Sequence, residues 1–218
     1  ARRAVDLIMA GHEPHPALLV DRHWNLLAAN DAAQNLMEGL APELLTPPIN
    51  VLRASLHPGG LASRILNLTE WRGHVLERLR RDLAASADPV LAALLAELAA
   101  FPAPPAAVGR AHGPDYGGVA VPLRMSSPYG PLSFISTTTL FGTAVDVTLS
   151  ELVLETFFAA DEHTARVMTE AAAARPGCAP LNVHGAFTFN IHQYLTVAAG
   201  GLLHEGRINL RRPAVRGA

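Results

Sequence analysis

The chain has 218 residues, of which 50% are hydrophobic and 17% are charged, and its formal net charge at pH 7 is -2. This size and composition predict one sizeable hydrophobic core rather than extended disorder. The near-neutral charge excludes the basic surface with which a free-standing nucleic-acid-binding protein neutralises phosphates. Cys178 is the only cysteine, which excludes an intramolecular disulfide and a cysteine-based zinc site.

Other compositional features indicate the compartment. No apolar run reaches the roughly 18 residues expected of a membrane-spanning helix, and the N-terminal residues lack a signal-peptide pattern. The basic residues are all arginine and alanine is abundant, as in proteins from GC-rich bacterial genomes. We therefore expect a soluble, cytoplasmic bacterial protein with no membrane partner.

The first predicted element is a short helix over residues 4–10, which Gly11 ends and which Pro14 and Pro16 prevent from resuming. An amphipathic helix that stops before Gly and Pro is typical of a connection between domains. We therefore interpret residues 1–13 as a linker helix from a preceding domain.

Two short apolar runs follow, at 17–21 and 24–29, and predict a tight hairpin of two strands. Asn30 or Asp31 is expected to cap the next helix, which runs through Leu40. A short side-chain oxygen at this position accepts hydrogen bonds from the first free backbone N–H groups of a helix.

The middle of the chain is predicted to be a helical hairpin. The first helix carries an apolar residue at every fourth position, namely Trp71, Val75, Leu79 and Leu83. Its other faces carry four arginines that we interpret as a solvated surface, namely Arg72, Arg78, Arg80 and Arg81. Asp88 and Pro89 start the second helix as its N-cap and first helical residue, and Phe101-Pro102 ends it.

Residues after this hairpin are rich in β-forming side chains. A Pro- and Gly-rich loop is expected at 102–115, followed by an antiparallel meander with strands at 118–125, 132–141 and 143–149. A last helix is expected from Asp161 through the alanines at 171–174. Two strands, a helical block, three strands and a helix make an α+β fold, since parallel βαβ units are not indicated.

Four long stretches of the chain agree in order and spacing with one known family. They are PALLVDRHWNLLAAN (16–30), NVLRASLHPGGLASRILNLTEW (50–71), LLAELAAFP (94–102) and LSFISTTTLFGTAVDVTLSELVLETFFAADEHT (132–164). On these stretches the chain resembles the ligand-binding domain of MmyB-like transcription regulators over roughly residues 14–170. The resemblance implies a PAS-like antiparallel β-sheet, with a large helical block covering one face, around an apolar pocket for a fatty acid or another lipophilic effector.

The resemblance also implies a domain organisation. Full-length members carry an XRE-type helix-turn-helix ahead of this domain, so DNA is expected to bind only through that missing N-terminal module. Residues 14–175 are expected to form the PAS-like ligand-binding domain. Residues 176–218 match nothing in the family and are expected to form either an extra hairpin, with strands at 187–197 and 202–212, or a poorly ordered tail.

The resemblance adds weight to candidate ligand-binding residues on the helices and strands. The apolar candidates are Leu66, Trp71, Leu79, Leu94, Leu98, Val121, Leu123, Leu132, Phe134 and Leu140. For each of them the simpler interpretation is a core position, since apolar residues at helix or strand period are usually core. The candidates to bind a carboxylate head group are Arg53, His57, Asn50 and Ser136. His57 is better explained as a histidine bonded to backbone in the turn that Pro58, Gly59 and Gly60 form.

The leading hypothesis is the sensing domain of a bacterial transcription regulator, in which effector binding repositions or dimerises an attached DNA-binding domain. The alternative is a dimerisation or protein-interaction module without an effector, with a homodimer as its product. A third hypothesis, an enzyme acting on acyl substrates, is disfavoured because the sequence shows no nucleophile beside a base. The ten histidines are scattered without metal-ligand spacing, so we expect neither a metal nor a cofactor.

Overall fold

The computed structural model describes residues 2–102, 120–140 and 152–174. Its strands are β1 (Ala17–Val20), β2 (Leu26–Ala29), β3 (Leu123–Met125), β4 (Leu132–Leu140) and β5 (Val153–Ala159). Its α-helices are α1 (Arg2–Gly11), α2 (Asp31–Leu36), α3 (Val51–Leu56), α4 (Leu68–Ser86), α5 (Pro89–Ala100) and α6 (Glu162–Ala173), and its 3-10 turns are η1 (Pro42–Leu45) and η2 (Leu61–Arg64). No helix within the described ranges is both long and apolar enough to cross a membrane.

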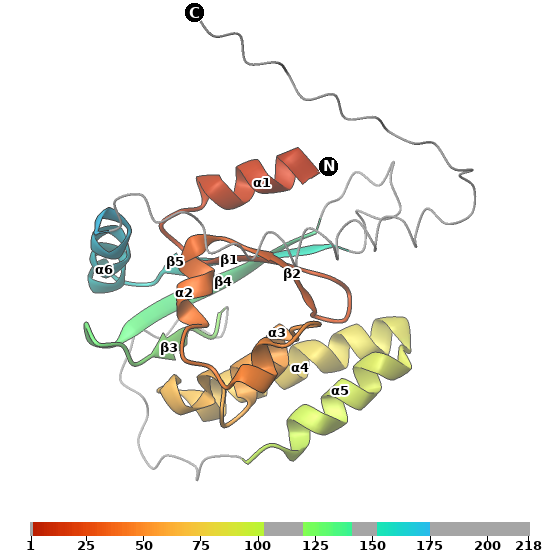
Figure 1. Ribbon diagram of the computed structural model, residues 1–218. Coiled ribbons are helices and arrows are strands. Elements are labelled where there is room, and N and C mark those ends of the chain that lie inside the picture. The colour runs from red at the N-terminus through yellow and green to blue at the C-terminus, as the bar shows by residue number, and fades with distance from the viewer. Residues whose placement is uncertain (1, 103–119, 141–151, 175–218) are drawn as a thin grey trace, which may run out of the picture.

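The five strands form one antiparallel sheet in the order β2-β1-β5-β4-β3 (Figure 1). β1 and β2 precede the helices α2 to α5 in the chain, and β3 to β5 follow them. β5 inserts between β1 and β4, where Leu154 pairs with Leu19 and Thr156 pairs with Thr137. Two strands before and three after a helical connection confirm the α+β class and the PAS-like sheet that the sequence predicts.

Different helices cover the two faces of the sheet, because side chains alternate between the faces along each strand (Figure 1). The helices α3, α4 and α5 lie beneath one face, where the main core forms around the fully buried side chains of Phe134, Leu79 and Leu98. α1 lies on the opposite face, where Val5 and Met9 pack on strand residues in a smaller cluster. The helical block therefore covers one face, as expected.

Three helices begin where the sequence predicts, because a short polar side chain caps each of them. The Asn30 side chain accepts a hydrogen bond from the Ala33 N–H at 3.0 Å, and Asp88 accepts one from the Val90 N–H at 2.8 Å. Asp161 caps α6 in the same way. These bonds satisfy backbone donors that have no partner within the helix.

Two elements differ from the sequence prediction. α2 ends at Leu36 instead of Leu40, and the chain then reverses through Gly39, whose positive φ of 76° is accessible to glycine at little cost. The sequence pattern also does not predict β5, the strand that completes the sheet. A buried glutamate in the middle of β5 interrupts the apolar pattern by which strands are recognised.

Other predicted segments lie outside the described residues. They are the strand at 143–149, all of the loop at 102–115 except its first residue, and the C-terminal extension at 176–218. The two interpretations of the C-terminal extension, and the domain limits drawn from it, therefore stay predictions.

Candidate ligand-binding site

A cavity of about 90 Å³ lies between the sheet and the helices α2, α3 and α4. Leu18, Leu123 and Phe157 form its wall on the side of the sheet, and Met37 and Leu52 are among the side chains that close it from the helices. Apolar pockets with a few polar groups at one side are the usual binding sites for apolar small molecules.

Aromatic side chains of the cavity wall are held by ring and polar contacts. The Trp71 indole N–H donates to the Ser55 hydroxyl at 2.9 Å, and the indole stacks on the His74 ring with centroids 5.5 Å apart. The Phe157 ring meets Phe134 edge to face, with centroids 6.5 Å apart. Such contacts favour one orientation of each ring, so the cavity has a defined shape on this side.

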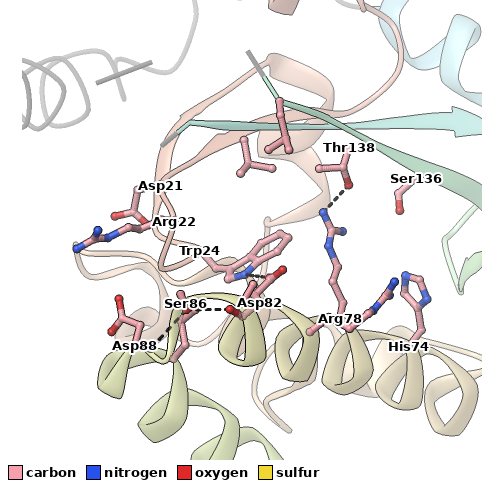
Figure 2. A pocket seen from close by; sticks show the side chains of 15 residues that line it. Asp21, Arg22, Trp24, His74, Arg78, Asp82, Ser86, Asp88, Ser136 and Thr138 are labelled. Carbon is pink, nitrogen blue, oxygen red and sulfur yellow. Dashed lines mark hydrogen bonds between the residues drawn. The ribbon is translucent and has the colours of Figure 1, made fainter. Parts of the chain in front are cut away.

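A larger groove, of about 660 Å³, opens beside the cavity between α4 and the strands β4 and β5 (Figure 2). His74, Arg78 and Arg81 line it from α4, and Ser136 and Thr138 line it from β4. Its volume lies within the range of roughly 300–1,000 Å³ that small-molecule sites occupy. The groove differs from the cavity in offering charged and hydroxyl groups to a ligand.

Three side chains, Trp24, His74 and Arg78, line both the cavity and the groove. Arg78 donates to the two carboxylate oxygens of Glu155 at 3.0 and 2.9 Å, and also to the Thr138 hydroxyl. Its guanidinium carbon lies 4.3 Å from the centroid of a Trp24 ring. The Arg78 side chain is 20% exposed and that of Glu155 only 7%. This bidentate ion pair therefore forms the partition between the two spaces.

A comparison with known protein families matches residues 1–171 to the MmyB-like transcription regulator ligand binding domain. The chain belongs to this family. The match spans α1 through most of α6, and so includes every strand of the sheet, the cavity and the groove. Residues 1–171 therefore form the ligand-binding domain of an MmyB-like transcription regulator, a family of regulator domains and not of enzymes, which confirms the resemblance found in the sequence. A search of curated proteins finds no significant match.

Three aspartates that line the groove are already engaged within this MmyB-like domain. Asp21 accepts a hydrogen bond from the His23 N–H at 2.8 Å, and Asp82 accepts one from the Trp24 indole N–H at 3.3 Å. His23 Nε2 lies 2.8 Å from Asp88, a contact that holds the pKa of the Asp88 carboxyl below its ordinary value. In the described part of the chain, no three His, Cys, Asp or Glu side chains converge to hold a metal ion.

His74 lies in the wall between the cavity and the groove, where its surroundings favour the neutral imidazole. Burial lowers its pKa below the ordinary 6.5, and Arg78 and Arg81 lower it further, against the opposing effect of Glu155. A neutral imidazole carries one donor and one acceptor nitrogen. His74 can therefore take part in ligand binding in the MmyB-like domain without adding charge.

The apolar residues predicted to bind ligand divide between these spaces and the core. Trp71 and Leu123 line the cavity, and Leu140 lines the groove. Six others pack in or against the main core and line neither space, namely Leu79, Leu94, Leu98, Val121, Leu132 and Phe134. Leu66 lies on the surface, 55% exposed. These six residues therefore occupy core positions, as the simpler interpretation of the sequence predicts.

Of the four predicted head-group residues, only Ser136 lines the groove. Arg53 donates to both carboxylate oxygens of Glu97, at 2.5 and 2.7 Å, on the outside of α3 and α5. Asn50 caps α3 by accepting a bond from the Arg53 N–H at 3.0 Å. His57 accepts a bond at 3.0 Å from a backbone N–H in the turn that follows α3, as the simpler interpretation predicts.

The sequence prediction for Arg78 is wrong. The sequence pattern places Arg78 with three other arginines on a solvated face of its helix, but its guanidinium points to the sheet, where Thr138 lies (Figure 2). There it pairs with Glu155. The available signal is Glu155 itself, a carboxylate in the middle of an otherwise largely apolar, buried strand. Burying an unpaired carboxylate costs several kcal/mol, so such a residue requires a cation from elsewhere in the chain.

Proposed function

We propose that this domain binds a lipophilic, fatty-acid-like effector between its sheet and the helices α2 to α4, and that binding controls an attached DNA-binding domain. The observation that supports this most directly is the apolar cavity inside the fold of a ligand-binding family. Burial of an acyl chain contributes about 0.8 kcal/mol per methylene, so a chain of roughly twelve methylenes gains on the order of 10 kcal/mol before ordering costs.

The cavity must widen to hold a whole acyl chain. Its volume of about 90 Å³ is below the roughly 300 Å³ at which small-molecule sites begin. Leu36, Met37 and Leu61 line it from short helical segments, and an unbranched methionine adapts readily to a new shape. Occupation of the cavity therefore requires the helices to move relative to the sheet, and this movement is the signal in the proposed mechanism.

A direct contact connects the cavity to α1. His12, in the turn after α1, has its Nε2 3.0 Å from the backbone carbonyl oxygen of Phe157, whose side chain lines the cavity. The His12 ring also meets Phe158 edge to face at 5.0 Å. A shift of β5 on ligand binding is thereby transmitted to α1 on the other face. The size of the effect is set by the difference in the ligand's affinity for the ligand-free and ligand-bound conformations of the domain.

Thermal shift with fatty acids of increasing chain length tests the proposal, together with mass spectrometry of lipid extracted from the purified domain. Val51→Phe fills the cavity from α3, whereas Val90→Phe adds the same ring at an exposed position on α5. We expect fatty acids to raise Tm in the wild type and in Val90→Phe but not in Val51→Phe. If no lipid is extracted and no lipophile shifts Tm, the proposal fails.

The alternative function, a dimerisation module without an effector, is supported by two apolar side chains on the outer face of α1, Leu7 and Ile8, which are 66% and 41% exposed. It predicts a homodimer in lipid-free protein. Light scattering of delipidated wild type and of Leu7→Glu separates the two functions, because only the alternative requires a dimer that forms without lipid and dissociates in the variant.

A further inference from the structure

One edge of the groove carries basic side chains, and some of its polar groups have no partner among the described residues. His74, Arg78 and Arg81 stand at positions i, i+4 and i+7 of α4 and share one helix face, opposite Ser136 on β4 (Figure 2). Arg81 has no carboxylate within ion-pair distance among the described residues, and within the same ranges the Ser136 hydroxyl has no hydrogen-bond partner. A guanidinium and a hydroxyl on facing walls can together bind an anion.

The charges that line the groove balance one another, but they are not all paired. Arg22, Arg78 and Arg81 line it together with Asp21, Asp82 and Asp88, and Glu155 is bonded to Arg78. The three aspartates are engaged with His23 and Trp24. Among the described residues, no carboxylate forms an ion pair with Arg81, so its guanidinium is available to an anionic ligand.

The position of Arg78 links this edge to the cavity. Arg78 lines both spaces. A fatty acid whose carboxylate binds Arg78 in the groove therefore has its acyl chain next to the cavity. Its present partner is also a carboxylate, bound by the two-pronged geometry that a guanidinium offers to any carboxylate. Glu155 thus occupies, from within the protein, the place that a ligand carboxylate fits.

We propose that Arg78 and Arg81, with Ser136, form the site for the carboxylate head group of the effector, and that this head group competes with Glu155 for Arg78 while the Thr138 hydroxyl continues to donate to Glu155. The inference rests on the proposed function and makes it more specific. The effector is a free long-chain carboxylate, and its neutral esters bind more weakly. Opening of the Arg78–Glu155 pair is the step that joins the cavity to the groove.

Binding of dodecanoate and of its methyl ester, measured by calorimetry, tests the assignment. Arg81→Gln removes the charge of an exposed side chain. Arg80→Gln is its matched control, because Arg80 pairs with Glu77 and does not line the groove. We expect Arg81→Gln to weaken dodecanoate binding about fivefold to tenfold, as loss of one charged contact predicts. The affinity of Arg81→Gln for the ester stays unchanged. The affinity of Arg80→Gln stays unchanged for both ligands.

Glu155→Gln tests the competitor role. With the competing charge removed, dodecanoate binds more tightly by about tenfold while the ester gains less. Ser136→Ala, which keeps the fold, gives a second and smaller loss confined to the acid. Equal affinity for acid and ester, unaffected by Arg81→Gln, overturns the head-group assignment and leaves the proposed function standing. Absence of binding by both ligands overturns the proposed function together with the inference.

Discussion

The two faces of the sheet are built very differently. On one face, α3, α4 and α5 enclose a large core that holds Leu79 and Phe134 at 0% exposure and surrounds the cavity. On the other, α1 packs through Val5 and Met9 on a small cluster that includes Leu19 and Leu154. Buried apolar area sets the strength of each attachment. The helical face therefore contributes more of the stability of the fold, and we expect α1 to detach more easily than the helices of the main core.

Truncation of a core side chain on the helical face gives the largest effect. Leu79→Ala removes a fully buried side chain of α4 and is expected to lower the free energy of unfolding by about 2–5 kcal/mol. Urea denaturation measures the loss. Leu66→Ala, at a surface position, is expected to change stability by less than about 0.5 kcal/mol. Similar losses in the two variants would contradict the assignment of Leu79 to the core.

Truncation on the α1 face is expected to act locally. Met9→Ala weakens the cluster between α1 and the sheet, and we expect a loss near the lower end of the roughly 2–5 kcal/mol typical of buried Met→Ala changes, with a larger loss of hydrogen-exchange protection in α1 than in β4. Leu7→Ala, on the exposed side of the same helix, is the control. Equal loss of protection in α1 and β4 would show that the two faces unfold as one unit.

Local signals account for most of the fold that the sequence predicts. Asn30, Asp88 and Asp161 mark helix starts by chemistry that acts within three residues, and all three cap helices in the structure. Strands β1 and β2 are recognisable because short apolar runs flank a turn. β5 depends instead on its place between β1 and β4, since its two sides face different cores and its centre carries Glu155.

The site is less predictable than the fold for a related reason. Trp71 and Leu123, which line the cavity, are found from helix and strand period, although the same pattern also selects pure core residues such as Leu98. Arg78 is not found, because its partner Glu155 is distant in the sequence and only the folded chain brings them together. Periodicity predicts which side is buried, and the partner of a buried charge follows from tertiary structure.

Acidification tests whether buried histidines weaken both faces of the sheet. Burial lowers the pKa of His74 on the helical side, and burial with the charge of His12 lowers that of His15 near α1, both from 6.5. Each lowered pKa means that the folded state binds a proton less readily than the unfolded state. The two histidines therefore cost no stability above pH 6.5, and the free energy of unfolding falls as the pH drops from 6.5 toward the folded-state pKa. We expect Tm to fall between pH 7.5 and 5.5 on this ground.

His74→Gln and His15→Gln separate the two contributions to this pH dependence. Each variant should flatten part of the decline, because glutamine has no charge to gain. The carboxyl groups of Glu97 and Asp88 do not interfere, since their pKa values lie below the ordinary 4.5 and 3.8. A decline that persists unchanged in both variants would exclude the two histidines as its cause.

The smallest expected effect concerns the ion pair between Arg53 and Glu97, which joins α3 to α5 at the surface of the helical face. The bond from Arg53 lowers the pKa of Glu97, but both side chains are more than a third exposed, at 37% and 38%, so solvent screens the pair. A double-mutant cycle with Arg53→Gln and Glu97→Gln should give a coupling of about 0.2–1 kcal/mol.

Because Arg53 lies outside the groove and the cavity, Arg53→Gln should leave dodecanoate affinity unchanged. A selective loss of dodecanoate binding in that variant would instead place the head group at Arg53, on the outer side of α3, and would contradict its assignment to the groove.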